Sequence, residues 1–209
     1  INPLDGGNGS DWLSFGLWGG GSSVNYTLNS GVTKNFENVV GSGSNYTLTG
    51  DASQNSLHGG SGDDIILGGD GDDLLYGDIT ENGTGSVYSM DNGIGQGPAY
   101  GHNDTGNDII KGQAGNDTLF GAAGDDQLDG GTGADTINSG TGSDTIILRT
   151  GDGGSSLADG DTINDFTDGT DVFGLDNNLL YTELTIAQGA GSNSSDTIIS
   201  VGSEYLAII

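Results

Sequence analysis

A nine-residue repeat sets the strongest limit on what this chain can fold into. Two tandem copies, GGSGDDIIL and GGDGDDLLY, start at Gly59, and five more, NDTGNDIIK, GQAGNDTLF, GAAGDDQLD, GGTGADTIN and SGTGSDTII, start at Asn103. A separate early copy, GGNGSDWLS, starts at Gly6. The shared pattern is G-G-x-G-x-D-x-U-x, where U is a large aliphatic residue. A short fixed period predicts a coil of stacked units rather than a core assembled from distant segments.

Each copy divides into a turn and a short strand. Positions one to six are rich in glycine, which adopts positive φ without steric cost and therefore suits a tight turn. Positions seven to nine predict a three-residue strand whose central aliphatic side chain points inward. These inward residues are Ile66, Leu75, Ile110, Leu119, Leu128, Ile137 and Ile146. We therefore expect an all-β fold, namely a right-handed parallel β-roll with a C-terminal cap of β-strands.

The sixth position is aspartate in all eight of these copies. If two nonapeptides make one coil, turns on the same side are 18 residues apart, so Asp108 stacks on Asp126 and Asp126 on Asp144. Neighbouring strands lie about 4.8 Å apart, and carboxylates at that spacing repel unless a cation lies between them. Two aspartates and about four backbone carbonyls form the all-oxygen shell that Ca²⁺ prefers. The repeat therefore predicts several calcium ions, stacked between turns on the same side.

The predicted metal ligands comprise carboxylates and turn residues. Magnesium is less suitable because it demands a tighter geometry, and zinc lacks cysteine and has only His58 and His102 as histidines. The carboxylates are Asp11, Asp64, Asp73, Asp108, Asp117, Asp126, Asp135 and Asp144. The turn residues are Gly59, Gly60, Ser61, Gly62, Gly68, Gly69, Asp70, Gly71, Asn103, Thr105, Gly106, Gly112, Ala114, Gly115, Gly121, Ala123, Gly124, Gly130, Gly131, Thr132, Gly133 and Gly142.

The repeat weakens at both ends of the chain, which predicts three regions. Residues 1–58 are read as degenerate coils, in which Tyr46 and Asn55 stand where other copies have aspartate. Residues 59–147 are the calcium-binding roll. Residues 148–209 contain short apolar segments that predict the capping strands. Within the first region Trp12, Phe15, Leu17 and Trp18 favour a hydrophobic cap, with an aromatic ligand platform as the alternative. Within the last, Asp152, Asp159 and Asp161 are candidates for a terminal metal site.

A 26-residue insertion, residues 77–102, interrupts the repeat. Asp73 and Asp108 are 35 residues apart, and subtracting the 26 inserted residues leaves nine, so the insertion keeps the nine-residue phase. One continuous roll is therefore expected, with Asp64 stacked on Asp108. The insertion itself is read as a surface loop, or as a binding element carrying Tyr88, Met90, Tyr100 and His102.

Composition excludes several classes of function. The formal net charge is −27, and only Lys34, Lys111 and Arg149 are basic, which excludes nucleic-acid binding and disfavours anionic membranes. Cysteine is absent, and no apolar run is long enough to span a membrane. No secretory signal opens the chain, and it begins at Ile1, so we read it as part of a longer protein.

The repeat also predicts that calcium controls folding. One buried aliphatic residue in nine gives little apolar burial to offset the entropy of ordering the coil, and the acidic charge opposes compaction further. Calcium must therefore supply much of the folding free energy, as metals do in small metal-binding domains. We expect a disordered chain without calcium and a β-rich one with it.

These nonapeptides resemble those of RTX proteins, which are bacterial type I secretion substrates. The resemblance is strong over residues 59–76 and 103–147, and the C-terminal DTINDFTDGTDVFGLD and DTIISVGSEYLAII resemble the region that follows such repeats. It implies an uncleaved C-terminal secretion signal, transit through a type I exporter, and folding outside the cell, where calcium fills sites of about 10⁻⁴–10⁻³ M.

The sequence predicts a non-enzymatic monomer. It contains no HExxH, GxSxG or GxxxxGK[ST] motif, and His58 lies inside a repeat. The favoured interpretation is a calcium-folded secretion module of a large extracellular or surface protein such as an adhesin. The alternatives are the same module on a secreted protease, lipase or alginate epimerase, or a β-roll that binds a carbohydrate or cell surface.

Overall fold

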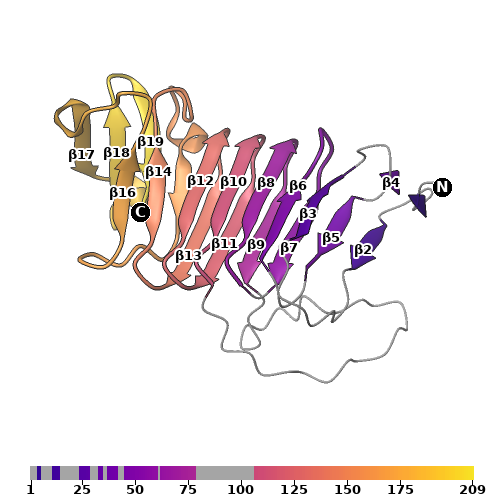
Figure 1. Cartoon of the computed structure of the whole chain (residues 1–209). Helices are drawn as coiled ribbons and strands as arrows, with labels where there is room; N and C mark the ends of the chain where they lie inside the picture. Colours follow the sequence, from indigo (N-terminus) through magenta and orange to yellow (C-terminus); the bar gives the residue numbers. More distant parts are fainter. Residues whose placement is uncertain are drawn as a thin grey trace.

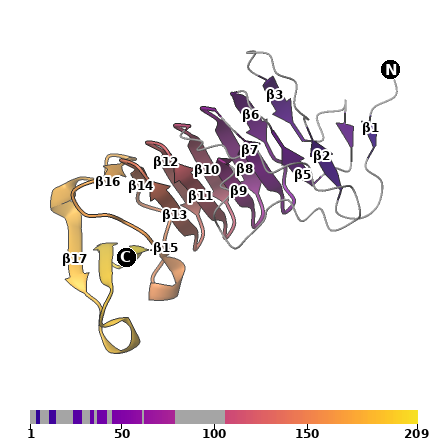
Figure 2. The ribbon, with the colours of Figure 1, turned by 90° about the horizontal axis from the view of Figure 1, so that it is seen from below.

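Successive nonapeptides form strands that alternate between two stacked parallel sheets (Figure 1). The computed structural model describes residues 4–5, 11–14, 24–28, 33–34, 37–41, 45–60, 62–78 and 106–209. These residues form an all-β parallel β-roll, as the repeat predicts. The N-terminal strands and the C-terminal cap lie at opposite ends of the roll, and the view in Figure 2 separates the two rows of strands.

The first sheet contains the strands that follow every second turn. In sheet order these strands are β16 (Val172–Leu175), β14 (Thr145–Leu148), β12 (Gln127–Thr132), β10 (Ile109–Ala114), β8 (Ile65–Asp70), β6 (Tyr46–Thr49) and β3 (Val24–Thr27). All the pairings among them are parallel.

The second sheet contains the alternate strands and continues into the cap. In sheet order these are β17 (Leu184–Gln188), β18 (Thr197–Val201), β19 (Glu204–Ile208), β15 (Asp161–Ile163), β13 (Thr136–Thr141), β11 (Thr118–Ala123), β9 (Leu74–Asp78), β7 (Ser56–Gly60), β5 (Asn38–Val40) and β2 (Trp12–Ser14). Strands β1 (Leu4–Asp5) and β4 (Thr33–Lys34) form a separate pair.

The strand register follows the 18-residue coil. Ile110 of β10 pairs with Leu128 of β12, and Leu119 of β11 pairs with Ile137 of β13. The phase also survives the insertion, because Ile65 of β8 pairs with Ile109 of β10. The excursion begins later than predicted, however, since residues 77 and 78 still belong to β9.

The eighth position of the repeat builds the core, as predicted. All of these aliphatic side chains are 0% exposed: Ile66, Leu75, Ile110, Leu119, Leu128, Ile137 and Ile146, together with Leu48 and Leu57 from the degenerate coils. They form one cluster that runs the length of the roll. In this apolar column each regular coil buries one such side chain from each of the two sheets, so the turns on either side contribute strongly to how the coils stack.

The C-terminal segments form a mixed cap. Strand β15 pairs in parallel with β19, and β17, β18 and β19 form an antiparallel extension. Strand β16, by contrast, joins the opposite sheet beside β14. Three short 3₁₀ helices lie in this part: η1 (Leu157–Asp159), η2 (Tyr181–Glu183) and η3 (Gly191–Asn193). The tail therefore closes the end of both sheets.

The predicted aromatic cap lies mostly outside the described residues. Of Trp12, Phe15, Leu17 and Trp18, the structure describes only the backbone of Trp12, which lies in β2. Within the described residues, no helix has the length and apolar composition needed to cross a membrane.

Candidate metal sites

Carboxylates of the sixth position stack along each side of the roll. On one side, the backbone N–H of Asp108 donates to Oδ1 of Asp126 at 2.8 Å, and that of Asp126 donates to Oδ1 of Asp144 at 3.0 Å. The full series, which we call the first ladder, is Tyr46, Asp64, Asp108, Asp126, Asp144 and Asp171. Each acidic side chain is thus fixed by the coil before it.

The other side of the roll repeats this arrangement. The N–H of Asp73 donates to Oδ1 of Asp117, and the N–H of Asp117 donates to Oδ1 of Asp135 at 2.8 Å. This second ladder consists of Asn55, Asp73, Asp117, Asp135 and Asp161. The predicted pairs are therefore in place on both sides, including the pair across the insertion.

The second carboxylate oxygen in these ladders is buried without a hydrogen-bond donor. This holds for the Oδ2 atoms of Asp73, Asp117, Asp126, Asp135 and Asp144, whose residues are at most 3% exposed. An unsatisfied buried acceptor is rare in native proteins and costs about 1–3 kcal/mol, more if it is charged. Rows of such oxygens therefore point to a cation as the missing partner.

Glycine at the first position keeps a space open beside Oδ2 of Asp73, Asp117, Asp126 and Asp135, whereas the copy that contains Asp144 has Ser139 there. A Cβ on Gly112 would meet Oδ2 of Asp117 and the carbonyl oxygen of Gly130 in the next coil. A Cβ on Gly121 would likewise meet Oδ2 of Asp126 and the carbonyl oxygen of Ser139. Carboxylate and carbonyl oxygens from successive coils thus face one small space. Hard oxygen donors from a flexible backbone suit calcium.

The carboxylates act in pairs rather than in larger groups. In the described part of the chain, no three Asp, Glu, His or Cys side chains converge in a way that could hold a metal ion. Most of a calcium shell would therefore have to come from backbone carbonyls.

Burial raises the pKa values of the ladder aspartates in the metal-free molecule. It raises the pKa of Asp73 to about 7, and those of Asp117 and Asp126 to about 6, with neighbouring carboxylates adding to the shift. Burial and mutual repulsion also raise the pKa values of Asp135 and Asp161. Stacked carboxylates without a cation therefore hold protons close to neutral pH.

A further ladder of hydrogen bonds, which the repeat pattern did not predict, connects the fifth positions. Oδ1 of Asp63 accepts from the N–H of Asn107, and Oδ1 of Asn107 accepts from the N–H of Asp125 at 2.8 Å. The direction is opposite to that of the sixth-position ladders, where the earlier residue donates. An Asp or Asn at this exposed position therefore joins coils without needing a metal.

Several predicted site residues lie elsewhere or outside the described part. Ser61, Asn103 and Thr105 are not among the described residues. Gly77, predicted to start the insertion, instead takes the first position beside Oδ2 of Asp108. Asp159 belongs to neither ladder, because its carboxylate accepts from Ser156 in a helix cap.

The structure adds three carboxylates that the repeat pattern did not single out as ladder members. Oε2 of Glu37 accepts from the N–H of Asp11 at 2.9 Å, as an aspartate of the next coil would. Asp161 and Asp171 extend the two ladders beyond the last nonapeptides. The intervals that separate these residues from their partners are 26 or 27 residues instead of 18. The sequence does carry a signal for two of them, the GxD of residues 169–171 and the D-T-I-N of residues 161–164.

Stacked parallel turns with paired, buried carboxylates are the arrangement expected of calcium-binding repeats. A family model of the RTX calcium-binding nonapeptide repeat (four copies) matches residues 47–79, 102–137 and 122–154. The chain therefore carries an RTX repeat region, folded as a parallel β-roll. No curated protein was found to match the chain.

The raised pKa values predict that protonation at acidic pH can partly replace calcium in stabilising the folded roll. The folded carboxylates have pKa values above their ordinary 3.8, so the folded state binds more protons than the unfolded state. Protonation therefore stabilises the metal-free roll fully below about pH 4, and this contribution is lost as pH rises through 6 to 7. In calcium-stripped buffer, circular dichroism should show more β-structure at pH 5 than at pH 8. Equal or weaker β-signal at pH 5 would contradict this.

Proposed function

We propose that the chain is a calcium-folded module that supports type I secretion and extracellular folding of a larger protein. The observation that carries this proposal is the double row of buried, donor-free Oδ2 atoms beside glycine-lined spaces. Calcium at these places would be held by carboxylates such as those of Asp117 and Asp135, and by first-position carbonyls such as that of Gly130. When bound, it supplies the positive charge that lets the acidic coils stack.

The same features explain why the module would remain unfolded before export. The chain carries a formal net charge of −27, and its core is one column of aliphatic side chains. Without divalent cations, carboxylate repulsion exceeds what this column contributes, so the chain stays extended enough to pass through a channel. Millimolar calcium outside the cell then fills sites of about 10⁻⁴–10⁻³ M. We accordingly place the parent protein outside the cell or on its surface.

We further propose that the module is not catalytic and that its parent is an adhesin. His58 is 1% exposed, its Nε2 lies 2.9 Å from Oγ of Ser56, and its ring stacks on Tyr76 at 4.5 Å. Burial lowers the pKa of His58 to about 4, which keeps it neutral and favours a structural role. The Ser-, Thr- and Asn-rich composition supports an adhesin over a secreted enzyme as the parent.

Export of a fusion protein tests this function. A small carrier joined to the N-terminus of this chain should reach the medium in cells that contain a type I exporter. In calcium-free medium the exported chain should be degraded by added protease, and in millimolar calcium it should be resistant. A fusion lacking residues 148–209 serves as the control and should stay inside. Retention of the full fusion, or equal protease resistance without calcium, would refute the proposal.

A further inference from the structure

The segment after β14 contains a turn that is split in two. Residues 150–153 read T-G-D-G and residues 161–164 read D-T-I-N, which match positions one to four and six to nine of the nonapeptide. Gly151 has a φ of 97°, close to the 99° of Gly131 at the second position of a regular turn. Ile163 is 2% exposed, as expected of an eighth-position residue. Residues 154–160, which contain η1, lie between the two pieces.

Backbone hydrogen bonds stack the first piece on the preceding turn. In regular coils the fourth-position N–H donates to the third-position carbonyl of the next coil, as Gly115 donates to Thr132 at 3.0 Å. The N–H of Gly133 donates in the same way to the carbonyl oxygen of Asp152 at 3.1 Å. Asp152 thus occupies the third position of a further turn.

The second piece completes the ladder at its sixth position. The N–H of Asp135 donates to Oδ1 of Asp161 at 3.0 Å, and the N–H of Thr162 donates to the carbonyl oxygen of Asp135 at 2.8 Å. The corresponding bonds between Asp117 and the next regular coil are 2.8 and 2.9 Å. Asp161 therefore makes the same pair of hydrogen-bonded contacts with the coil of Asp135 that Asp135 makes with the coil of Asp117.

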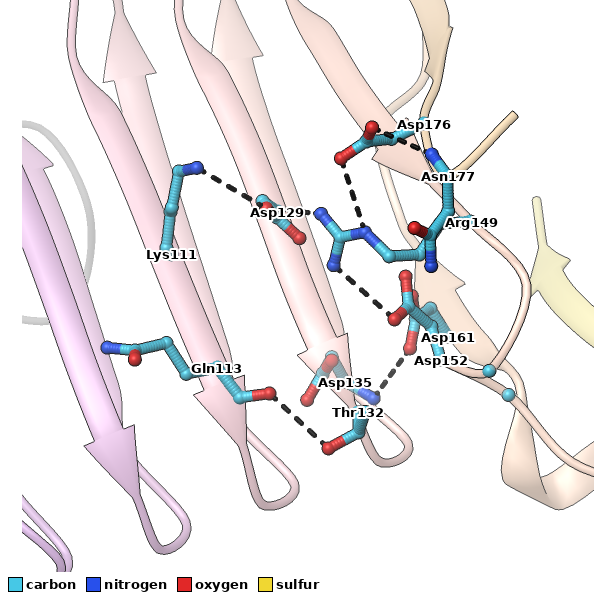
Figure 3. A network of polar contacts seen from close by, with 12 residues as sticks. Lys111, Gln113, Asp129, Thr132, Asp135, Arg149, Asp152, Asp161, Asp176 and Asn177 are labelled. Carbon is cyan, nitrogen blue, oxygen red and sulfur yellow. Dashed lines mark hydrogen bonds and ion pairs between the residues drawn. The ribbon is translucent and has the colours of Figure 1, made fainter. Parts of the chain in front are cut away.

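An unsatisfied oxygen lies between the regular turn and the split turn. Oδ2 of Asp135 has no hydrogen-bond partner, and the residue is 1% exposed. Asp161 and Asp152 are also buried, at 2% and 6% exposed, and both interact electrostatically with Asp135. Figure 3 shows these three side chains on neighbouring coils, with Asp152 turned toward Arg149. The buried carboxylates of Asp135 and Asp161, stacked in one step of the ladder, call for a compensating cation.

Arg149 supplies positive charge close to this place, but its ion pairs are with other carboxylates. Its guanidinium lies 2.6 Å from Oδ2 of Asp129, 3.4 Å from Oδ1 of Asp152 and 3.6 Å from Oδ2 of Asp176 (Figure 3). These ion pairs place the arginine outside the Asp135–Asp161 step of the ladder. That step is left to a separate cation.

The cap holds the split turn in shape. Oε1 of Glu204, in β19, accepts from the N–H of Gly151 at 2.6 Å and from that of Gly153 at 3.2 Å. The N–H of Tyr205 donates to the carbonyl oxygen of Gly154 at 2.8 Å. In this way β19 provides the acceptors that another coil would have provided. The docked cap therefore stabilises the split turn.

We infer that calcium binds between the turn 130–135 and the split turn, held by the carboxylates of Asp135 and Asp161 and by backbone carbonyls. This inference rests on the proposed function of the regular turns as calcium sites. Asp161 lies beyond residue 154, where the repeat match ends. The ion joins the roll to the cap, so docking of the cap and filling of this site strengthen each other.

The number of bound ions tests this site. Native mass spectrometry should find one calcium fewer on Asp161→Asn than on the wild type, at a calcium concentration that just saturates the wild type. The amide oxygen of the new side chain would still accept from the N–H of Asp135, so the change removes charge rather than the hydrogen bond. The matched control is Asp159→Asn, which alters a neighbouring exposed helix-cap carboxylate and should leave the ion count unchanged. Equal counts for Asp161→Asn and the wild type would overturn the inference.

If Asp161→Asn does not fold, a crystal structure of the wild type in calcium tests whether an ion occupies this site. An anomalous calcium peak beside Oδ2 of Asp135 and the carboxylate of Asp161 is the expected result. Ions in the regular turns without a peak here would refute this site alone. The absence of ions from every turn would instead refute the proposed function.

Discussion

Asp126→Asn should destabilise the calcium-loaded roll by about 3 kcal/mol or more, because a buried charged interaction loses one partner. Asp126 is 2% exposed, its Oδ1 accepts from the N–H of Asp108, and its Oδ2 borders the space beside Gly121. Asparagine keeps the acceptor but removes the negative charge that faces the ion. Isothermal titration should show a loss of bound calcium, and urea unfolding in millimolar calcium should show the destabilisation.

The neighbouring Asp125→Asn is the matched control for this change. Asp125 is exposed, and its Oδ1 accepts from the N–H of Ser143 in the fifth-position ladder. Asparagine preserves that hydrogen bond, so the change should stay within about 0.5 kcal/mol. Without calcium the destabilisation by Asp126→Asn should vanish or reverse, because the substitution removes the repulsion between the carboxylates of Asp126 and Asp144. An equal loss of stability with and without calcium would show that the carboxylate acts only through packing.

Gly112→Ala should have an effect of similar size through a different cause. The added Cβ would occupy the space between Oδ2 of Asp117 and the carbonyl oxygen of Gly130. Both groups are fixed by the coils on either side, so neither can move aside without disturbing the register. We expect a loss of about 3 kcal/mol or more in calcium, within the range for buried sites that cannot relax, together with weaker calcium binding. Urea unfolding and calcium titration measure the two effects.

Gly202→Ala separates this steric effect from the general effect of replacing a glycine. Nothing lies within 4 Å of a Cβ on Gly202, and its φ of 58° is left-handed. Its replacement should therefore cost only the left-handed penalty of about 1–2 kcal/mol and leave calcium binding intact. If Gly112→Ala proved no more harmful than Gly202→Ala and bound calcium normally, the space beside Asp117 would not be a metal site.

Most of the regular roll could be predicted because one period determines both the core and the ladders. The same nine-residue spacing that buries Ile110 also stacks Asp108 on Asp126. Once the phase was seen to survive the insertion, the pairing of Ile65 with Ile109 followed. In a solenoid each residue contacts its neighbours at fixed sequence distances, so periodicity gives long-range contacts directly.

The ends of the roll could not be predicted because the period fails there while the geometry continues. Glu37, Asp161 and Asp171 take ladder positions at intervals of 26 or 27 residues, which differ from the 18 of the regular coil. Hydrogen bonding to the preceding coil, rather than spacing in sequence, selects these residues. The sequence likewise indicates only the positive charge of Arg149, and not that its guanidinium joins carboxylates from three separate segments.

The central claim is that calcium is a condition of folding and not an addition to a folded roll. Far-UV circular dichroism of the intact chain near neutral pH, titrated with calcium from a chelated start, tests this most directly, with magnesium as the comparison. We expect a disordered spectrum in chelator, a cooperative gain of β-structure on adding calcium up to millimolar concentration, and no such gain with magnesium. A folded β-spectrum that persists unchanged in chelator would contradict the claim.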